Sequence, residues 1–275
     1  NILNQLEKGF IFLFLILMAS IPFAYRYVRT QRISLFVDTT SQISIDKNYI
    51  IAEKIRVIQV LFGAIFFLIH GTLFWGFINI VIFLFVTIII SLLAEIIGSK
   101  TGYVFGGKYQ YHKDNTPGYL IYGVPVLIPI AWFGIIYMCI NFCYHITKIN
   151  FPYDIHFNSY FIILTSIFVV LLDLVLDPIA VDEKRWEWQS PGSYYGVPIL
   201  NFFGWMVVPF VVLFFFQKLY QPIITNISSY SFIFQYAPGL LFIFLPVIAS
   251  RPCFERGLTI PGYIGISTFI IYLTI

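Results

Sequence analysis

Charge is scarce in this sequence. Only 11% of its 275 residues are Asp, Glu, Lys or Arg, whereas 59% are hydrophobic and 31 are Phe. A soluble globular domain carries roughly 25% charged and about 45–50% apolar residues, so this composition excludes a water-soluble fold. No stretch is polar and long enough to form a separate soluble domain. We therefore expect a single polytopic domain over residues 1–275, located in the cytoplasmic membrane and surrounded by the lipid bilayer.

The sequence is also poor in cysteine. Cys139, Cys143 and Cys253 fit no zinc-type spacing, so we predict no metal site. The apolar runs lack the two-residue alternation that is typical of a membrane β-barrel. The expected fold class is therefore an all-α integral membrane protein. Nothing in the composition indicates a nucleic-acid partner.

Eight membrane spans can be drawn along the chain. A helix needs ~20 apolar residues to cross a ~30 Å hydrocarbon core. The predicted spans cover about 10–25, 55–71, 74–97, 120–147, 158–178, 196–217, 230–250 and 258–275. The stretch from Ile55 to Ile97 is about twice as long as one span, so we predict a tight hairpin with a break near His70-Gly71-Thr72.

Basic residues favour one face of this eight-span topology. Of the 16 Lys and Arg residues, 13 fall in the loops on one face: Arg26, Arg29, Arg32, Lys47, Lys54, Arg56, Lys100, Lys108, Lys113, Lys184, Arg185, Arg251 and Arg256. The other face has only Lys8, Lys148 and Lys218. By the positive-inside rule, the first set of loops is predicted to be cytoplasmic and the N-terminus to lie outside.

The sequence contains an internal repeat. Each copy has a Tyr-Gly-Val-Pro step followed by a tryptophan, and the two copies are 73 residues apart. An aromatic pair precedes each step. The matching elements are Tyr109-x-Tyr111, Tyr122-Gly123-Val124-Pro125 and Trp132 in the first copy, and Trp186-x-Trp188, Tyr195-Gly196-Val197-Pro198 and Trp205 in the second. We predict parallel repeats over about 74–147 and 158–217, in which the proline lies near the start of a helix.

Three acidic residues lie within strongly apolar runs. Glu95 follows Leu92-Leu93-Ala94, and Asp173 and Asp177 alternate with Leu and Val. An acidic residue at membrane depth costs at least ~2.5 kcal/mol, so such residues usually face the bundle interior and serve a function. The structural alternatives are pairing with loop arginines or tyrosines and, for Asp177-Pro178, a helix end in the headgroup region.

Asp173 and Asp177 are four residues apart and therefore project from one face of their helix. Two carboxyl groups in a low-dielectric environment repel each other, and burial also disfavours their ionised form. At least one is therefore expected to be protonated near neutrality. A neutral carboxylic acid in a dry, aromatic-lined cavity can donate a proton to a weak base such as a carbon–carbon double bond.

Several motifs between Glu95 and Trp205 are those of a known family. In the first repeat they are Glu95, Thr101-Gly102, Phe105-Gly106, Tyr109-x-Tyr111, Gly123-Val124-Pro125, Pro129 and Trp132. In the second they are Asp173, Asp177-Pro178-x-Ala180, Trp186-x-Trp188, Tyr195-Gly196-Val197-Pro198 and Asn201-Phe202-x-Gly204-Trp205. With these motifs the sequence resembles the membrane carotenoid 1,2-hydratases, also called carotenoid biosynthesis proteins, of the γ-carotene and bisanhydrobacterioruberin hydratase type.

The resemblance implies hydration of the terminal isopropylidene double bond of an acyclic carotenoid end group. The product would be a tertiary alcohol, and no redox cofactor is implied. Lycopene, γ-carotene and longer bacterioruberin precursors are typical substrates of the family. The partners implied are the carotenoid polyene, the lipid bilayer and other enzymes of the carotenoid pathway.

We assign hypothetical roles from this chemistry. Asp173 or Asp177 is the candidate acid, and its partner or Glu95 is the candidate base that orients water. Asn201 is a candidate to hold the attacking water, since its amide both donates and accepts. Aromatic faces would stabilise the carbocation or contact the polyene: Trp186, Trp188, Tyr195, Trp205, Tyr109, Tyr111 and Trp132. The alternative for each aromatic residue is a place in the interfacial belt.

Three other functions compete with the hydratase hypothesis. A lycopene-type cyclase would protonate the same double bond, but the polyene would trap the cation, so water access distinguishes the two. A proton-coupled transporter can also combine parallel repeats with membrane carboxylates. However, the charges here gather near one face and do not form a relay through the midplane. A non-catalytic carotenoid-binding scaffold is the third.

Overall fold

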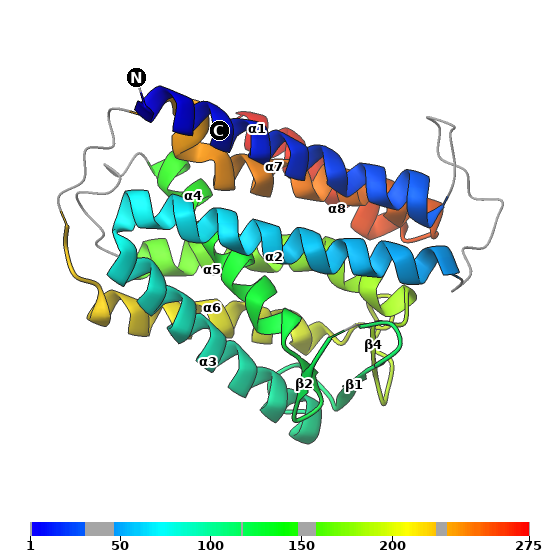
Figure 1. Ribbon diagram of the computed structural model, residues 1–275. Coiled ribbons are helices and arrows are strands. Elements are labelled where there is room, and N and C mark those ends of the chain that lie inside the picture. Colours follow the sequence, from blue (N-terminus) through cyan, green and yellow to red (C-terminus); the bar gives the residue numbers. More distant parts are fainter. Residues whose placement is uncertain (1, 31–46, 117, 148–157, 224–229, 275) are drawn as a thin grey trace.

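A computed structural model describes residues 2–30, 47–116, 118–147, 158–223 and 230–274 (Figure 1). Within these ranges the chain forms a helical bundle with two small two-stranded sheets. The helices are α1 (Ile2–Phe23), α2 (Lys47–Trp75), α3 (Phe77–Thr101), α4 (Leu127–Thr147), α5 (Ser159–Asp182), α6 (Ile199–Leu219), α7 (Phe232–Glu255) and α8 (Thr259–Thr274), and a π-helical segment, η1 (Ala24–Arg29), continues α1. The strands are β1 (Tyr109–Tyr111), β2 (Leu120–Ile121), β3 (Val124–Pro125) and β4 (Trp186–Trp188).

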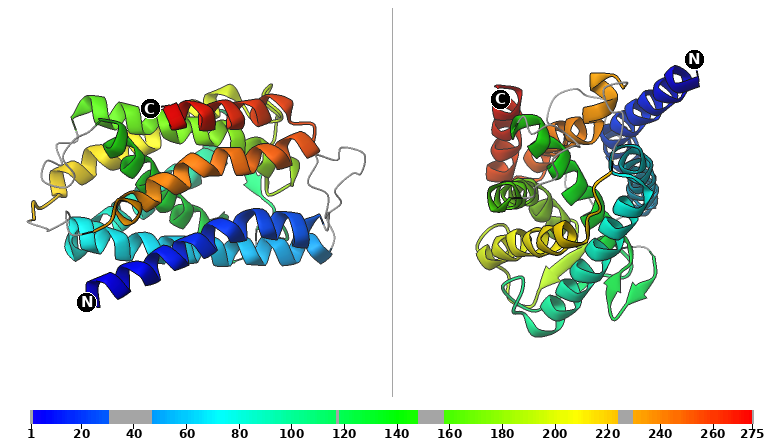
Figure 2. Two further views of the ribbon diagram at one scale, coloured as in Figure 1. Left: turned by 90° about the horizontal axis from the view of Figure 1, so that it is seen from above. Right: turned by 90° about the vertical axis from the view of Figure 1, so that its left-hand side faces the viewer.

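Seven of the helices in the described ranges are long and apolar enough to cross a membrane. The eighth, α8, has 16 residues and packs against α5 and α7. Each predicted span coincides with one helix, so the prediction of an all-α multi-pass membrane protein is confirmed. Figure 2 shows α1 at the outer edge of the bundle, where it contacts α2 and α7.

The predicted break between the second and third spans lies in the wrong place. The helix continues through His70-Gly71-Thr72 and ends at Trp75, and Gly76 turns the chain at φ +80°. His70 is fully buried within α2, where its ring nitrogens lie 2.8 Å from Tyr137 Oη and 2.9 Å from the Phe234 carbonyl oxygen. Gly71 is helical as well and lies directly against Ile80 of α3. These contacts favour a continuous helix, whereas Gly76 supplies the positive φ that the turn needs.

The predicted fourth span begins too early. Its first residues form a hairpin in which β2 pairs with β3, and α4 begins only at Leu127. Pro125 therefore precedes α4, and Pro198 caps the start of α6 at φ −66°. Proline suits both positions because it has no N–H to leave unbonded at a helix start.

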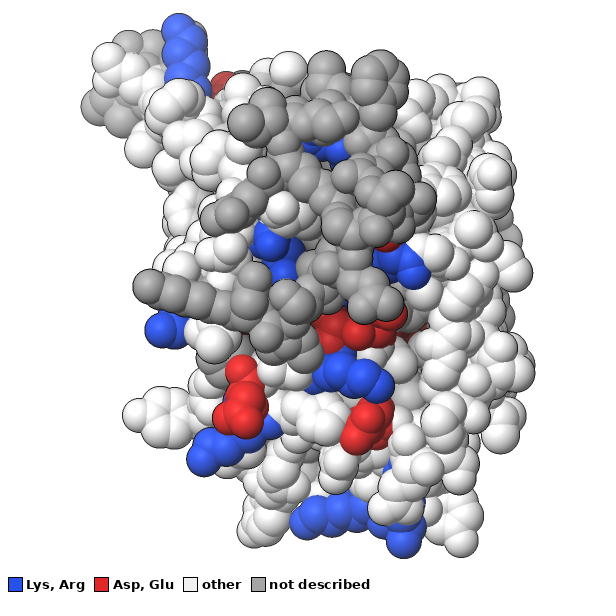
Figure 3. All heavy atoms as spheres, turned by 90° about the vertical axis from the view of Figure 1, so that its right-hand side faces the viewer, with Lys and Arg blue, Asp and Glu red and all other residues white. Residues whose placement is uncertain are grey.

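Charged side chains gather at the end of the bundle where α2 begins and α5 ends, as Figure 3 shows. Ion pairs join three of the predicted cytoplasmic loops there: Arg185 lies 3.1 Å from Glu53, and Arg256 lies 2.7 Å from Glu183. The flanks of the bundle carry exposed apolar residues such as Phe77, Phe85 and Leu93. This distribution agrees with the predicted charge bias, although Arg32 and Lys148 lie outside the described residues. Which face of the membrane this end occupies stays a prediction.

Candidate functional site

The two predicted repeats meet at a short antiparallel ribbon near the charged end of the bundle. Strand β1 pairs with β4, so that Tyr109 lies opposite Trp188 and Tyr111 lies opposite Trp186. Asn158 caps α5 by accepting from the Phe161 N–H, and α5 then runs unbroken to Asp182, just before β4. The C-terminal end of α5 therefore lies beside the ribbon of β1 and β4.

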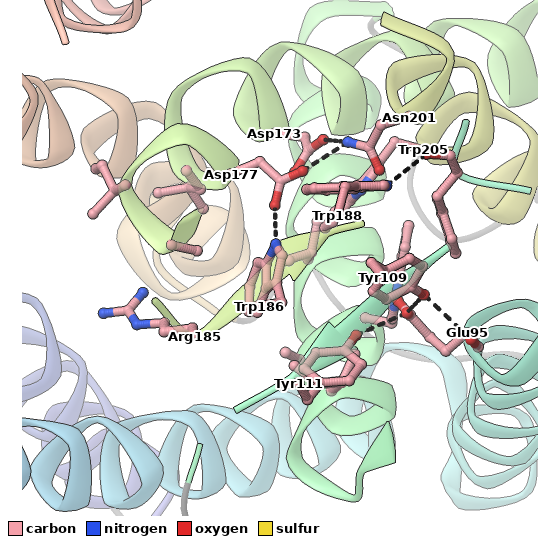
Figure 4. A pocket seen from close by; sticks show the side chains of 18 of the residues that line it. Glu95, Tyr109, Tyr111, Asp173, Asp177, Arg185, Trp186, Trp188, Asn201 and Trp205 are labelled. Carbon is pink, nitrogen blue, oxygen red and sulfur yellow. Dashed lines mark hydrogen bonds between the residues drawn. The ribbon is translucent and has the colours of Figure 1, made fainter. Parts of the chain in front are cut away.

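A cavity of about 240 Å³ lies against this ribbon, between α3, α4, α5 and α6 (Figure 4). It is lined by all three of the predicted membrane carboxylic residues, Glu95, Asp173 and Asp177. Their exposed fractions are 4%, 2% and 2%. Asp177 is buried and α5 continues past it to Asp182, so this residue does not stand at the helix end.

Glu95 is held by three donors from the first repeat. Trp132 Nε1 donates to its Oε1 at 2.9 Å, and Tyr111 Oη donates to its Oε2 at 2.8 Å. The Tyr109 hydroxyl donates to the same Oε2. Burial, together with the charge of Glu95, raises the pKa of Tyr109 and Tyr111 well above the ordinary value, so both hydroxyls keep the proton they donate. The resulting set of neutral donors suits an ionised carboxylate.

Asp173 and Asp177 are joined by a single amide. Asn201 Nδ2 donates to Asp177 Oδ2 at 2.7 Å and to Asp173 Oδ2 at 3.1 Å. Trp186 Nε1 donates to the other Asp177 oxygen, Oδ1, at 2.9 Å. Both oxygens of Asp177 therefore accept a hydrogen bond, whereas no donor in the described part of the chain bonds to Asp173 Oδ1.

Aromatic rings form most of the remaining wall. Trp132 and Trp205 stack with ring centroids 4.1 Å apart, and Trp188 packs on Tyr109 at 5.5 Å. The Trp188 indole donates to the Phe105 carbonyl oxygen at 3.1 Å. The structure thus brings ten of the eleven predicted site residues to one cavity: Glu95, Tyr109, Tyr111, Trp132, Asp173, Asp177, Trp186, Trp188, Asn201 and Trp205.

Some equivalent residues of the predicted repeats share a backbone conformation or contact each other. Tyr122 and Tyr195 both adopt φ +50°, and the equivalent tryptophans, Trp132 and Trp205, stack on each other. In the ribbon, Gln110 lies opposite Glu187, midway along the two paired strands. These features agree with two units related by an axis along the bundle, although the repeat itself stays a prediction.

Tyr195 is the predicted site residue that the structure does not bring to the cavity. Its hydroxyl lies 3.2 Å from Thr259 Oγ1 and accepts from the Ile260 N–H, so it contacts the start of α8. Its backbone adopts φ +50°, and it is not among the residues that line the cavity.

Two lining residues, Arg56 and Arg185, were not predicted as site residues. Both belong to the basic residues that predict the cytoplasmic loops. Arg185 directly precedes Trp186, and this adjacency was the available signal. Arg56 precedes a long apolar run and carries no such signal.

The described residues contain no group of three or more His, Cys, Asp or Glu side chains arranged to hold a metal ion. Cys139, Cys143 and Cys253 are all buried and unpaired with one another. The polar groups that line the cavity are carboxyl groups, one amide, phenols, indoles and the guanidinium groups of Arg56 and Arg185.

Comparison with known proteins gives one match. The sequence pattern of a family described as carotenoid biosynthesis protein matches residues 55–272, which include every residue of the cavity. No curated protein and no solved structure matches the chain.

Proposed function

Because the chain belongs to the carotenoid biosynthesis protein family, we propose that it is a carotenoid hydratase, which adds water to the terminal 1,2 double bond of an acyclic carotenoid. The family indicates an enzyme with a role in carotenoid biosynthesis. One observation carries the finer proposal: Glu95, Asp173 and Asp177 line the same buried, aromatic-walled cavity. Protonating an alkene requires such a pairing of carboxylic acid and apolar surroundings.

The hydrogen bonds favour Asp173 as the acid and Asp177 as the base. Both Asp177 oxygens accept hydrogen bonds, which stabilises its ionised form. Asp173 accepts through Oδ2, so Oδ1 is available to carry the proton. In the proposed reaction Asp173 protonates C2 and leaves a tertiary cation at C1. Water adds to C1 and loses a proton to Asp177. The return of this proton from Asp177 to Asp173 restores both groups, so the net change is the addition of one water molecule.

The rest of the cavity is suited to the cationic intermediate. The stacked faces of Trp132 and Trp205 and the nearby Trp186 can stabilise a carbocation through their ring quadrupoles. Glu95 is held in place by three donors and lines the same cavity. Arg56 and Arg185 line the cavity on the side of the charged end of the bundle, and hydration, unlike cyclisation, requires water to reach the carboxyl groups.

Expression in a lycopene-accumulating bacterial host tests the proposal. The expected product is more polar than lycopene and heavier by one water molecule, detected by chromatography with mass spectrometry. Asp173→Asn and Asp177→Asn should each abolish the product while the protein remains in the membrane. Asp114→Asn, which changes an exposed loop carboxylate, is the matched control and should retain activity.

Each other outcome has a definite meaning. An isomer of lycopene with unchanged mass and shifted absorption would replace the hydratase with a cyclase. Full activity in both aspartate variants would refute the acid–base assignment. Unaltered pigment, with lycopene, γ-carotene and a bacterioruberin precursor each supplied, would refute the reaction itself.

A further inference from the structure

A second cavity, of about 440 Å³, adjoins the candidate site. It is lined by residues of α1, η1, α2, α4, α5 and α7. Six residues line both cavities: Arg56, Ala131, Ile135, Leu176, Ile179 and Arg185. Because the same side chains form part of both walls, the two cavities are adjacent, and only these side chains stand between them.

The second cavity is elongated along the bundle. Its lining residues on α2 recur along one helical face from Glu53 to Phe67. These two residues are 14 positions apart, which corresponds to ~21 Å along a helix axis. Glycines widen it: a methyl group on Gly63 would find its nearest neighbour, Leu17, at 3.8 Å, and Gly134 faces Phe67.

Polar groups are concentrated at one end of this cavity. Glu53 pairs with Arg56 and Arg185, and these ion pairs form the end nearest the charged face of the protein. Farther along the cavity, where Gly63 of α2 and Met138 of α4 lie, the lining residues are apolar. An ionic ligand would lack partners over most of this length, whereas a long hydrocarbon would bury its surface.

We propose that the second cavity holds the polyene chain of the substrate while the reacting end group lies between the carboxyl groups of the first. The identity of the reacting end rests on the proposed function. The first cavity, at about 240 Å³, is about half the size of the second, which matches a compact end group followed by a long chain. The residues of α1, α2, α4 and α7 that line the second cavity would then set the affinity for long substrates.

Filling the second cavity tests this inference directly. Gly63→Leu and Gly134→Leu place side chains in it from opposite walls, and Ile65→Phe adds volume on the lipid-facing side of α2 as the matched control. Each protein is purified in detergent after expression with lycopene, and the polyene absorbance per protein is measured. Both leucine variants should retain at least tenfold less lycopene, equivalent to about 1.4 kcal/mol of binding free energy. The control should retain as much as the wild type.

A short hydrocarbon with the same isopropylidene end, myrcene, provides the second readout. It fits within the first cavity alone, so the leucine variants should convert lycopene poorly and myrcene as the wild type does. Undiminished lycopene retention in both leucine variants would overturn the inference and leave the hydratase proposal intact. Lycopene retention by the wild type without any hydrated product, and its loss in the leucine variants, would support the cavity and refute the reaction.

Discussion

At the scale of single residues, the two halves of the cavity differ in how they hold their carboxyl groups. Glu95 is bound by two phenols and an indole, whereas Asp177 is bound by an indole and an amide that it shares with Asp173. The shared amide is specific to the second half, because the position 73 residues earlier is Ile128. This difference suggests that proton transfer is confined to Asp173 and Asp177.

Replacing the shared amide tests that assignment. Asn201→Ala removes the donor to both aspartates and should lower the rate of lycopene hydration by about 10²-fold, the typical cost of removing one preorganised donor. Conversion is measured by chromatography at equal protein content. Gln110→Ala, a change at the exposed middle residue of β1, should leave the rate unchanged. Equal rates in all three proteins would show that the amide has no part in the chemistry.

Glu183 gives a pH dependence of stability. Burial raises its pKa from an ordinary value of 4.5 to about 7, despite the opposing charge of Arg256. Because the pKa of Glu183 is higher in the folded than in the unfolded state, its contribution to the free energy of unfolding is fully present below about pH 4.5. That contribution amounts to at most about 3 kcal/mol and is lost as the pH rises through 7. The melting temperature in detergent should therefore fall between pH 5 and pH 7, and the fall should be shallower in Glu183→Gln. Parallel curves for the two proteins would contradict this assignment.

At the scale of secondary-structure elements, the segment between β4 and α6 requires two stretches of its backbone to lie very close together. Gly192 and Gly196 are bridged, and Gly192 donates to the Gly196 carbonyl oxygen at 2.9 Å. A methyl group on Gly192 would lie 2.1 Å from the backbone nitrogen of Pro198, the residue that caps α6. This segment therefore fixes where α6 begins and, with it, the position of Asn201.

A single methyl group should disturb this arrangement. Gly192→Ala is expected to destabilise the protein by about 1–3 kcal/mol, as overpacking usually does, and to lower the melting temperature in detergent. Gly9→Ala on α1 is the control, because a methyl group there would meet no atom within 4 Å. Equal melting temperatures for Gly192→Ala and the wild type would show that this loop accommodates the methyl group without loss of stability.

At the scale of the whole molecule, the concentration of charge at one end gives a topology that can be measured. We expect the charged end to be cytoplasmic and the N-terminus to lie outside. In intact cells, a membrane-impermeant maleimide should label Lys218→Cys and spare Lys113→Cys. The three native cysteines are buried, so unsubstituted protein provides the background. The reverse labelling pattern would invert the topology and place the candidate site near the outer surface.

The sequence predicted the helices and most of the site for a common physical reason. An apolar run of membrane length, or a carboxylic residue within one, is conspicuous without knowledge of the fold. The turn at Gly76 and the late start of α4 were not predicted, because continuous hydrophobicity does not mark where a helix ends. Arg56 and Arg185 were assigned to topology alone, since a cation at a span end looks the same whether it faces solvent or a cavity. The position of the Tyr195 side chain was not predicted, because a sequence motif does not reveal a backbone angle.

The carboxyl groups of Glu95, Asp173 and Asp177 lie in the first cavity alone, and on the proposed binding mode this has a kinetic consequence. A polyene lying in the second cavity can present one end to these carboxyl groups, while its far end points away from them. A symmetrical carotenoid would have to leave, turn round and return before its other end could react. On the proposed function the enzyme would therefore work distributively, with the singly modified alcohol released as a free intermediate before any doubly modified product forms.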